Sequence, residues 1–131
     1  MDIEIGAKLD AADTVTAEKT AKHVGSGGLE VYATPCMAAL MEKAAYELLQ
    51  KYLPEGSGSV GISLDLEHTS ATPVGMGIRA EAEITAAEKR IITFSIKAYD
   101  GKGEIGHAVH KRCIVDNERF FTKAQDKLNI N

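Results

Sequence analysis

Residues 34–49, TPCMAALMEKAAYELL, decide the fold of this chain. Thr34-Pro35 is a favourable helix start, with Thr34 as the N-cap residue and Pro35 at the first helical position. Apolar residues then recur at steps of three and four, which is typical of a helix with one buried face. These residues are Met37, Leu40, Met41, Ala44, Ala45, Leu48 and Leu49. The pattern predicts one long helix with a single apolar stripe.

The chain after this helix has a hydrophobic period of two, which is typical of half-buried β-strands. Strands are predicted there over residues 60–68, 78–84, 91–99 and 104–115. In the first of them, one face is expected to carry Val60, Ile62, Leu64 and Leu66. Short turns join the strands, which favours an antiparallel meander. The remaining elements are a strand within residues 3–16 and a short helix over residues 117–128.

These elements predict an α+β fold in one domain, residues 1–131, in which an antiparallel sheet wraps around the long helix. The core must be mostly aliphatic, because 44% of the residues are hydrophobic but only 5% are aromatic. One helix on one small sheet leaves the outer sheet face and an edge strand uncovered. Dimerisation is a common way to cover both.

Composition and charge pattern argue against several classes of partner. The net charge is -4 and the Lys and Arg residues are scattered, so no nucleic-acid interface is expected. No apolar run is long enough to cross a membrane, and the N-terminus lacks the pattern of a signal peptide. Cys36 and Cys113 lack the close spacing of a zinc site and are interpreted as reduced thiols. These features predict a cytoplasmic protein.

Two candidates for chemistry come from residue placement. His68 is in phase with Val60, Ile62, Leu64 and Leu66, so in a regular strand we expect it at the end of the face that points to the helix. Glu42 flanks the apolar stripe, and no cation lies three or four residues away to pair with it. Each also has a structural interpretation, His68 as a core or rim histidine and Glu42 as a carboxylate that reaches solvent.

Thr34 is the third candidate, although capping the helix is a sufficient structural role. A helix start presents free N–H groups and the positive end of the dipole, which stabilise an oxyanion. A hydroxyl there, with a His and a Glu within reach, is a candidate nucleophile or water-orienting group. Cys36 is a rival nucleophile in the same turn. His107 and His110 are predicted on opposite faces of the last strand, with packing or surface roles.

Taken together, these segments resemble the fluoroacetyl-CoA thioesterase family of hot-dog proteins. The resemblance lies in residues 33–42 (ATPCMAALME), 58–61 (GSVG) and 68–75 (HTSATPVG). Residues 98–112 are similar to the last hairpin of the family. The resemblance spans most of the chain and implies a hot-dog fold.

The resemblance also implies an activity, the hydrolysis of a small acyl-CoA to free acid and CoA. The family's catalytic Thr, Glu and His correspond to Thr34, Glu42 and His68, and a glycine near the reacting carbonyl corresponds to Gly61. His68 would act as general base and then acid, Thr34 as nucleophile or water-positioning group, and Glu42 as the orienting carboxylate. The family implies a homodimer, or a dimer of dimers, with active sites at the dimer interface. It implies no metal and no cofactor, since CoA enters as part of the substrate.

One departure concerns the segment before the helix. The family member specialised for fluoroacetyl-CoA has a longer segment there, with aromatic residues that gate the pocket. Here residues 22–32 are short and Tyr32 is their only aromatic residue. A fluorine-selective gate is therefore not expected.

Two other functions fit the same fold. A hot-dog hydratase would need an Asp and a His in a loop pattern that residues 65–68 do not show. A dimer that binds an acyl-CoA, or another small acyl ligand, without turning it over is the main alternative to a thioesterase.

Overall fold

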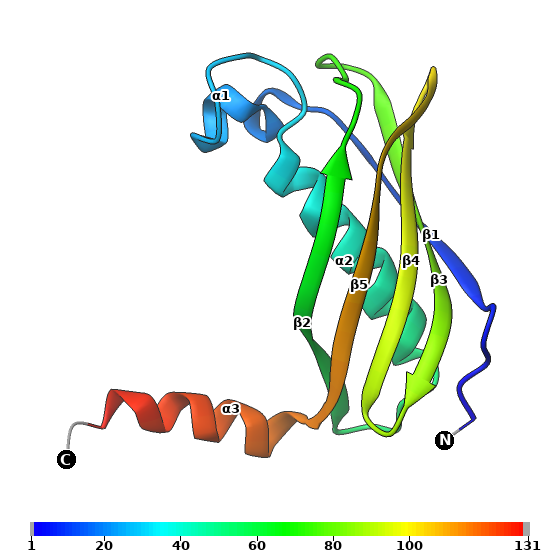
Figure 1. Cartoon of the computed structure of the whole chain (residues 1–131). Coiled ribbons are helices and arrows are strands. Elements are labelled where there is room, and N and C mark those ends of the chain that lie inside the picture. The colour runs from blue at the N-terminus through cyan, green and yellow to red at the C-terminus, as the bar shows by residue number, and fades with distance from the viewer. Residues whose placement is uncertain (1, 130–131) are drawn as a thin grey trace.

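The computed structural model describes residues 2–129, and Figure 1 shows the arrangement of its elements. A single antiparallel sheet has the strand order β1-β3-β4-β5-β2. Its strands are β1 (Lys8–Thr14), β2 (Ser57–His68), β3 (Gly77–Glu88), β4 (Ile91–Asp100) and β5 (Gly103–Asp116). The helices are α1 (Ala21–Val24), α2 (Thr34–Gln50) and α3 (Asn117–Gln125), with 3₁₀ turns at Ala17–Lys19 and Asp126–Leu128.

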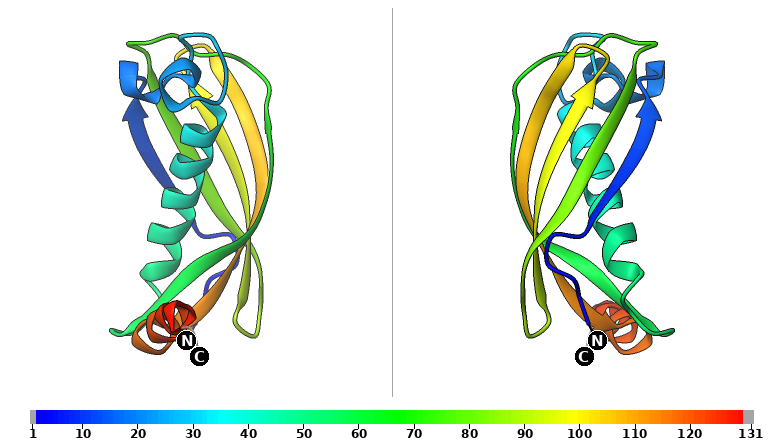
Figure 2. Two further views of the ribbon diagram at one scale, coloured as in Figure 1. Left: turned by 90° about the vertical axis from the view of Figure 1, so that its left-hand side faces the viewer. Right: turned by 90° about the vertical axis from the view of Figure 1, so that its right-hand side faces the viewer.

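The long helix α2 lies in the concave face of the curved sheet, as the two views of Figure 2 show. Every residue of the predicted apolar stripe is buried. The inner faces of β3 and β4 pack around this helix with Ile78, Ala80, Ala82, Ile84, Ile92, Phe94, Ile96 and Ala98. The predicted α+β hot-dog architecture, a sheet wrapped around one central helix, is confirmed.

A β-bulge interrupts β2 at Ile62. Gly61 pairs with Arg112 and Ser63 pairs with Lys111, so Ile62 has no partner opposite it on β5. A bulge of this kind shifts the inside–outside alternation of a strand by one residue.

The bulge corrects the predicted faces of β2. Leu64 and Leu66 pair with inward-facing residues of β5 and pack against the core, as predicted. Before the bulge the phase is reversed, so Ser59 and Gly61 face the helix and Val60 faces outward. Ile62 is 52% exposed. The prediction that Val60 and Ile62 face inward was therefore wrong.

The β2 edge of the sheet is open. The strand β2 is an edge strand, and within residues 2–129 its outer edge pairs with no other strand. The helix α3 follows β5 and projects away from the sheet on the β2 side (Figure 1). Phe120 is 46% exposed and Phe121 is 65% exposed on this helix. An open strand edge and a projecting helix with exposed aromatic rings are thus found together.

The segment between β1 and α2 has a defined conformation. It contains α1, which ends at Gly25 with a positive φ of 85°. Its last residues are fixed by the hydrogen bond from the Tyr32 N–H to the Thr72 carbonyl, 2.9 Å long. This segment therefore reaches the start of α2 in a defined position.

Within residues 2–129, no helix has the length and apolar character needed to span a membrane.

Candidate active site at the start of the central helix

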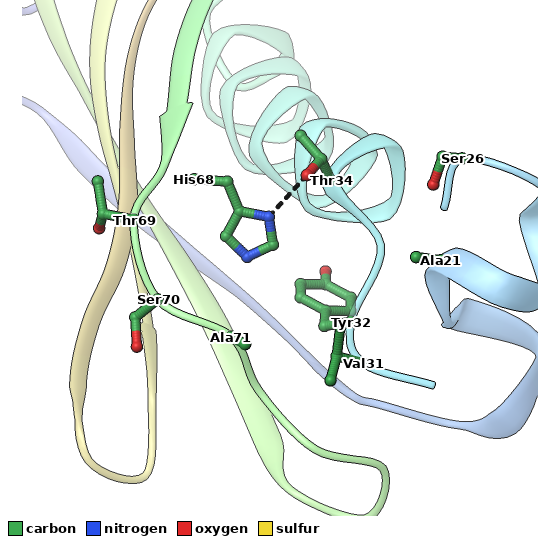
Figure 3. Close-up of a pocket in the computed structure, with 9 residues that line it drawn as sticks. All are labelled: Ala21, Ser26, Val31, Tyr32, Thr34, His68, Thr69, Ser70 and Ala71. Carbon is green, nitrogen blue, oxygen red and sulfur yellow. Dashed lines mark hydrogen bonds between the residues drawn. The ribbon is translucent and has the colours of Figure 1, made fainter. Parts of the chain in front are cut away.

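Thr34 and His68 form a direct hydrogen bond. The Thr34 Oγ lies 2.8 Å from His68 Nδ1, which joins the first turn of α2 to the last residue of β2 (Figure 3). The prediction that Thr34 caps the helix was wrong. Ala33 occupies the N-cap position with an extended backbone, and its carbonyl accepts from the N–H groups of Cys36 and Met37. The Thr34 hydroxyl is therefore free to pair with His68.

The His68 ring is suited to accept a proton from Thr34. If the Thr34 hydroxyl donates, Nδ1 is the unprotonated nitrogen and Nε2 carries the ring proton. Burial lowers the pKa of His68, and the nearby Ser70 backbone, which favours the charged ring, opposes this only in part. The buried Nε2 has no hydrogen-bond partner among residues 2–129. A neutral imidazole whose unprotonated Nδ1 accepts from a hydroxyl is arranged as a general base.

This pair opens onto a cavity of about 310 Å³. The cavity lies between the α1 segment and the chain that follows β2, and Figure 3 shows its lining side chains. The lining residues are Ala21, Ser26, Val31, Tyr32, Thr34, His68, Thr69, Ser70 and Ala71. Its size is at the small end of the range for ligand pockets, which suits a short acyl group.

Glu42 does not join this pair within one chain. It lies eight residues after Thr34 on α2, which corresponds to about 12 Å along the helix axis. Its Oε2 is 3.7 Å from the Arg112 Nη1, so its partner comes from β5 as an inward-facing cation. The structure therefore brings two of the three predicted catalytic residues together and places the third in a different cluster.

Gly61 belongs to the cluster around Glu42. A Cβ atom at this position would lie 2.9 Å from the Glu42 Oε2 and 3.2 Å from the His110 Cε1. These approaches explain why a residue without a side chain stands there. The bulge at Ile62 is what turns Gly61 toward the helix.

His110 and Arg112 complete this second cluster, and the sequence did not single out Arg112. The Arg112 guanidinium donates to the Ser59 hydroxyl at 2.8 Å and the Ser59 carbonyl at 3.0 Å. It also lies 3.2 Å from the His110 Nε2, while the His110 Nδ1 bonds the Ser63 carbonyl at 2.8 Å. The available signal was strand parity, since both residues share the inner face of β5 with the buried Ile114.

The two histidines of β5 lie on opposite faces, as predicted. His110 is buried, and burial lowers its pKa, with the Arg112 charge acting in the same direction. His107 is exposed, and each of its ring nitrogens lies 3.4 Å from a carboxylate, of Glu67 and Glu104. Neither histidine lines the cavity beside Thr34.

The rival nucleophile Cys36 packs against the hydrophobic core and does not line the cavity. Both cysteines are free thiols. Within residues 2–129, no group of three or more His, Cys, Asp or Glu side chains is arranged to hold a metal ion.

Comparison with known proteins assigns this chain to a protein family. Residues 15–118 match the family described as fluoroacetyl-CoA-specific thioesterase. A fluoroacetyl-CoA thioesterase from Streptantibioticus cattleyicolor is 32% identical over 131 residues, which cover 95% of this chain and 94% of that protein.

Solved structures agree with this match. A variant of the fluoroacetyl-CoA-specific thioesterase in complex with fluoroacetate and CoA has a TM-score of 0.84 at 32% identity, covering 89% of this chain and 98% of that chain. A thioesterase superfamily member from Thermus thermophilus has a TM-score of 0.88 at 25% identity, covering 97% of this chain and 96% of that chain.

Proposed function

Because this chain belongs to the fluoroacetyl-CoA-specific thioesterase family, we propose that it hydrolyses a small acyl-CoA thioester at the Thr34–His68 pair. It is a thioester hydrolase, and its products are the free acid and CoA. The observation that carries the assignment of the site is the 2.8 Å contact between the Thr34 Oγ and His68 Nδ1 beside the cavity. A hydroxyl and a neutral imidazole in contact are the first two members of an acyl-transfer triad.

The proposed reaction has two steps, acylation of Thr34 and hydrolysis of the acyl ester. His68 Nδ1 takes the hydroxyl proton as the Thr34 Oγ attacks the thioester carbon, and the C–S bond then breaks. The imidazolium returns its proton to the leaving CoA thiolate. Water, deprotonated by the same nitrogen, next attacks the acyl ester on Thr34, the ester C–O bond breaks, and the imidazolium returns the proton to the Thr34 Oγ as the acid leaves. If Thr34 instead only positions this water, no acyl-Thr34 species accumulates, and mass spectrometry of the enzyme mixed rapidly with substrate distinguishes the two routes.

Glu42 takes part from a second subunit in this proposal. The free edge of β2 favours pairing with another β2 strand, because unpaired edge groups seek hydrogen-bond partners. In an antiparallel pair, the His68 end of one strand lies beside the first half of the other, which contains the partner's Gly61. Since Glu42 lies against Gly61, the partner's Glu42 approaches the Thr34–His68 pair. The active site is then completed at the interface of a homodimer, the minimal unit of any dimer of dimers.

The acyl group is small and is not selected by an aromatic gate. The segment that would carry such a gate is a short helix followed by residues 25–28, of which three are glycine. Its single aromatic residue, Tyr32, is a buried part of the cavity wall. We therefore expect acetyl-CoA and other short acyl-CoAs to be hydrolysed without strong preference for fluoroacetyl-CoA. The reaction needs water but no resident cofactor, and it belongs in the cytoplasm, where free thiols such as Cys36 persist.

A panel of short-chain and aromatic acyl-CoAs tests the proposal, with release of free CoA thiol as the readout. The wild type should turn over the short substrates, and His68→Ala should lower kcat by roughly 10³-fold because the base is lost. The matched control is His107→Ala, which removes an exposed histidine from the outer sheet face and should leave kcat unchanged. Equal, slow turnover by wild type and His68→Ala would show that the site is wrongly assigned. Tight binding of an acyl-CoA that stays intact for hours would favour the non-catalytic binding dimer.

A further inference from the structure

Tyr32 lies directly beside the Thr34–His68 pair. Its ring meets the His68 ring edge to face, with the centroids 6.3 Å apart and the planes at 80°. The residue is only 2% exposed, yet it lines the cavity, and Figure 3 shows its hydroxyl pointing into the space between His68 and Ala21. The hydrogen bonds among residues 2–129 include none from this hydroxyl. The phenol is therefore available to a molecule in the cavity.

The start of α2 supplies few donors for an oxyanion. Pro35 has no N–H group, and the N–H groups of Cys36 and Met37 both donate to the Ala33 carbonyl. The Thr34 N–H is the donor of this turn that remains. Oxyanion holes contain at least two donors in most acyl-transfer enzymes, and side-chain donors such as Tyr can replace backbone groups.

The environment of Tyr32 keeps its hydroxyl in the donating form. Burial raises the pKa of Tyr32 far above its ordinary value, and the neighbouring Cys36 and Asp13 act in the same direction. A phenol that stays protonated across the working pH range donates a hydrogen bond without transferring its proton. This separates its role from that of His68, which must exchange a proton in each step.

We propose that the Tyr32 hydroxyl is an oxyanion donor, which binds the thioester carbonyl oxygen and the negative charge that forms there when the carbon is attacked. As the C=O π electrons move onto oxygen, the hydrogen bond from Tyr32 strengthens, and it weakens again when the carbonyl re-forms and CoA thiolate leaves. Tyr32 keeps its proton throughout. This inference rests on the proposed thioesterase function, and it adds a catalytic residue to the Thr34–His68 pair.

Tyr32→Phe tests the inference, because it removes one oxygen and keeps the ring against His68. We expect kcat for a short acyl-CoA to fall roughly 10²-fold, as for loss of one oxyanion donor, with KM within about twofold of wild type. The matched control is Tyr99→Phe, which keeps the ring over Arg79 away from the cavity and should leave both constants unchanged. A kcat for Tyr32→Phe within about threefold of wild type, with His68→Ala inactive, overturns the inference alone. A wild type that hydrolyses no acyl-CoA overturns the proposed function as well.

A second measurement separates donation from packing and does not depend on the stability of Tyr32→Phe. A fluorinated tyrosine placed only at position 32 keeps the shape of the side chain but makes the phenol more acidic. Because a phenolate cannot donate, a variant with enough ring fluorines to ionise this phenol should lose kcat with rising pH inside the range where Tyr32 of the wild type stays protonated. An alkaline limb that coincides with that of the wild type contradicts the role of Tyr32 as a donor.

Discussion

Two polar clusters lie along α2, and they differ in how far their hydrogen-bonding groups are satisfied. At the start of the helix, the Thr34–His68 pair faces a cavity and leaves the buried His68 Nε2 without a partner. About two turns further along α2, Glu42 lies near Arg112 of β5, which is 6% exposed. The Arg112 guanidinium bonds to Ser59 and His110. Buried polar groups in folded proteins normally have hydrogen-bond partners. The contrast supports the proposal that the first cluster binds and reacts, whereas the Arg112 network of the second cluster holds the sheet to the helix and leaves the Glu42 carboxylate half-exposed.

Loss of the Thr34 hydroxyl should affect activity much more than stability. Thr34→Val keeps the shape of the side chain, and we expect kcat to fall roughly 10³-fold because the nucleophile is lost. The free energy of unfolding should change by less than about 0.5 kcal/mol, since Thr34 does not cap the helix. Thr34→Ser is the matched control and should retain much of the activity. If Thr34→Val keeps its activity but its free energy of unfolding falls by about 1 kcal/mol, the role of Thr34 is to cap the helix.

In the second cluster the same kind of change should act on stability first. Arg112→Met fills a similar volume but removes the donors to Ser59 and His110. We expect about 2 kcal/mol lower free energy of unfolding, discounted for the half-exposed Glu42 carboxylate. Denaturant titration measures this loss. Arg79→Met, which breaks an exposed ion pair with Asp10, is the control and should cost less than about 0.5 kcal/mol. Equal effects of the two substitutions would show that the buried network does not stabilise the fold.

Gly61→Ala alters the packing at the point where β2 meets the second cluster. The added Cβ would meet the movable end of Glu42 at 2.9 Å and the His110 ring at 3.2 Å. Because the Glu42 side chain can turn away, we expect a loss of only about 1 kcal/mol in unfolding free energy. The contact between Glu42 and Arg112 should lengthen, which a crystal structure of the variant would show. An unchanged Glu42 position would contradict the packing described for Gly61.

Changes of pH should have smaller effects than these substitutions. They should appear in the activity for the first cluster and in the stability for the second. The pKa of His68 is lowered by burial, and its neutral form is the proposed base. The acid limb of kcat/KM should therefore lie below the ordinary histidine value of about 6.5, with activity lost as pH falls through it. A rate profile with an acid limb above 6.5, or one that His68→Ala leaves in place, would exclude His68 as the titrating base.

The second cluster should respond to pH through stability. His110 also has a lowered pKa in the folded state, so the unfolded chain binds more protons between the two values. Its contribution to stability is complete above the unfolded value and is lost as pH falls from about 6.5 toward the lower folded value. Urea titrations at several pH values measure this slope. His110→Asn should flatten it, and a slope that the substitution does not change would assign the effect to other groups.

Much of the fold could be predicted because its signals are periodic. The stripe from Met37 to Leu49 and the alternation of residues 78–84 and 91–99 each repeat often enough to identify a helix or strand. The bulge at Ile62 has no such signature, since one unpaired residue leaves the composition of the strand unchanged. For this reason, the inward-facing residues of β2 were predicted correctly for the part after the bulge and wrongly for the part before it.

The candidate site could be predicted only in part, for two physical reasons. Strand parity correctly placed His68, but capping preference alone assigned Thr34 to a structural role that Ala33 fills. Glu42 was recognised as a carboxylate without a local cation, yet its partner Arg112 comes from the far end of the chain through a register that the bulge sets. No sequence pattern pointed to Tyr32 as a functional residue, because only the folded structure places it beside His68.

The most direct test of the central claim is complementation between two inactive variants. If Thr34 and His68 of one subunit react together with the partner's Glu42, His68→Ala and Glu42→Gln each spoil both sites of their own dimers. A mixed dimer then contains one intact site, so random mixing should restore about one quarter of the wild-type activity. We predict this recovery when the two proteins are unfolded and refolded together. A mixture that stays as inactive as its two parents would contradict an active site completed across the dimer.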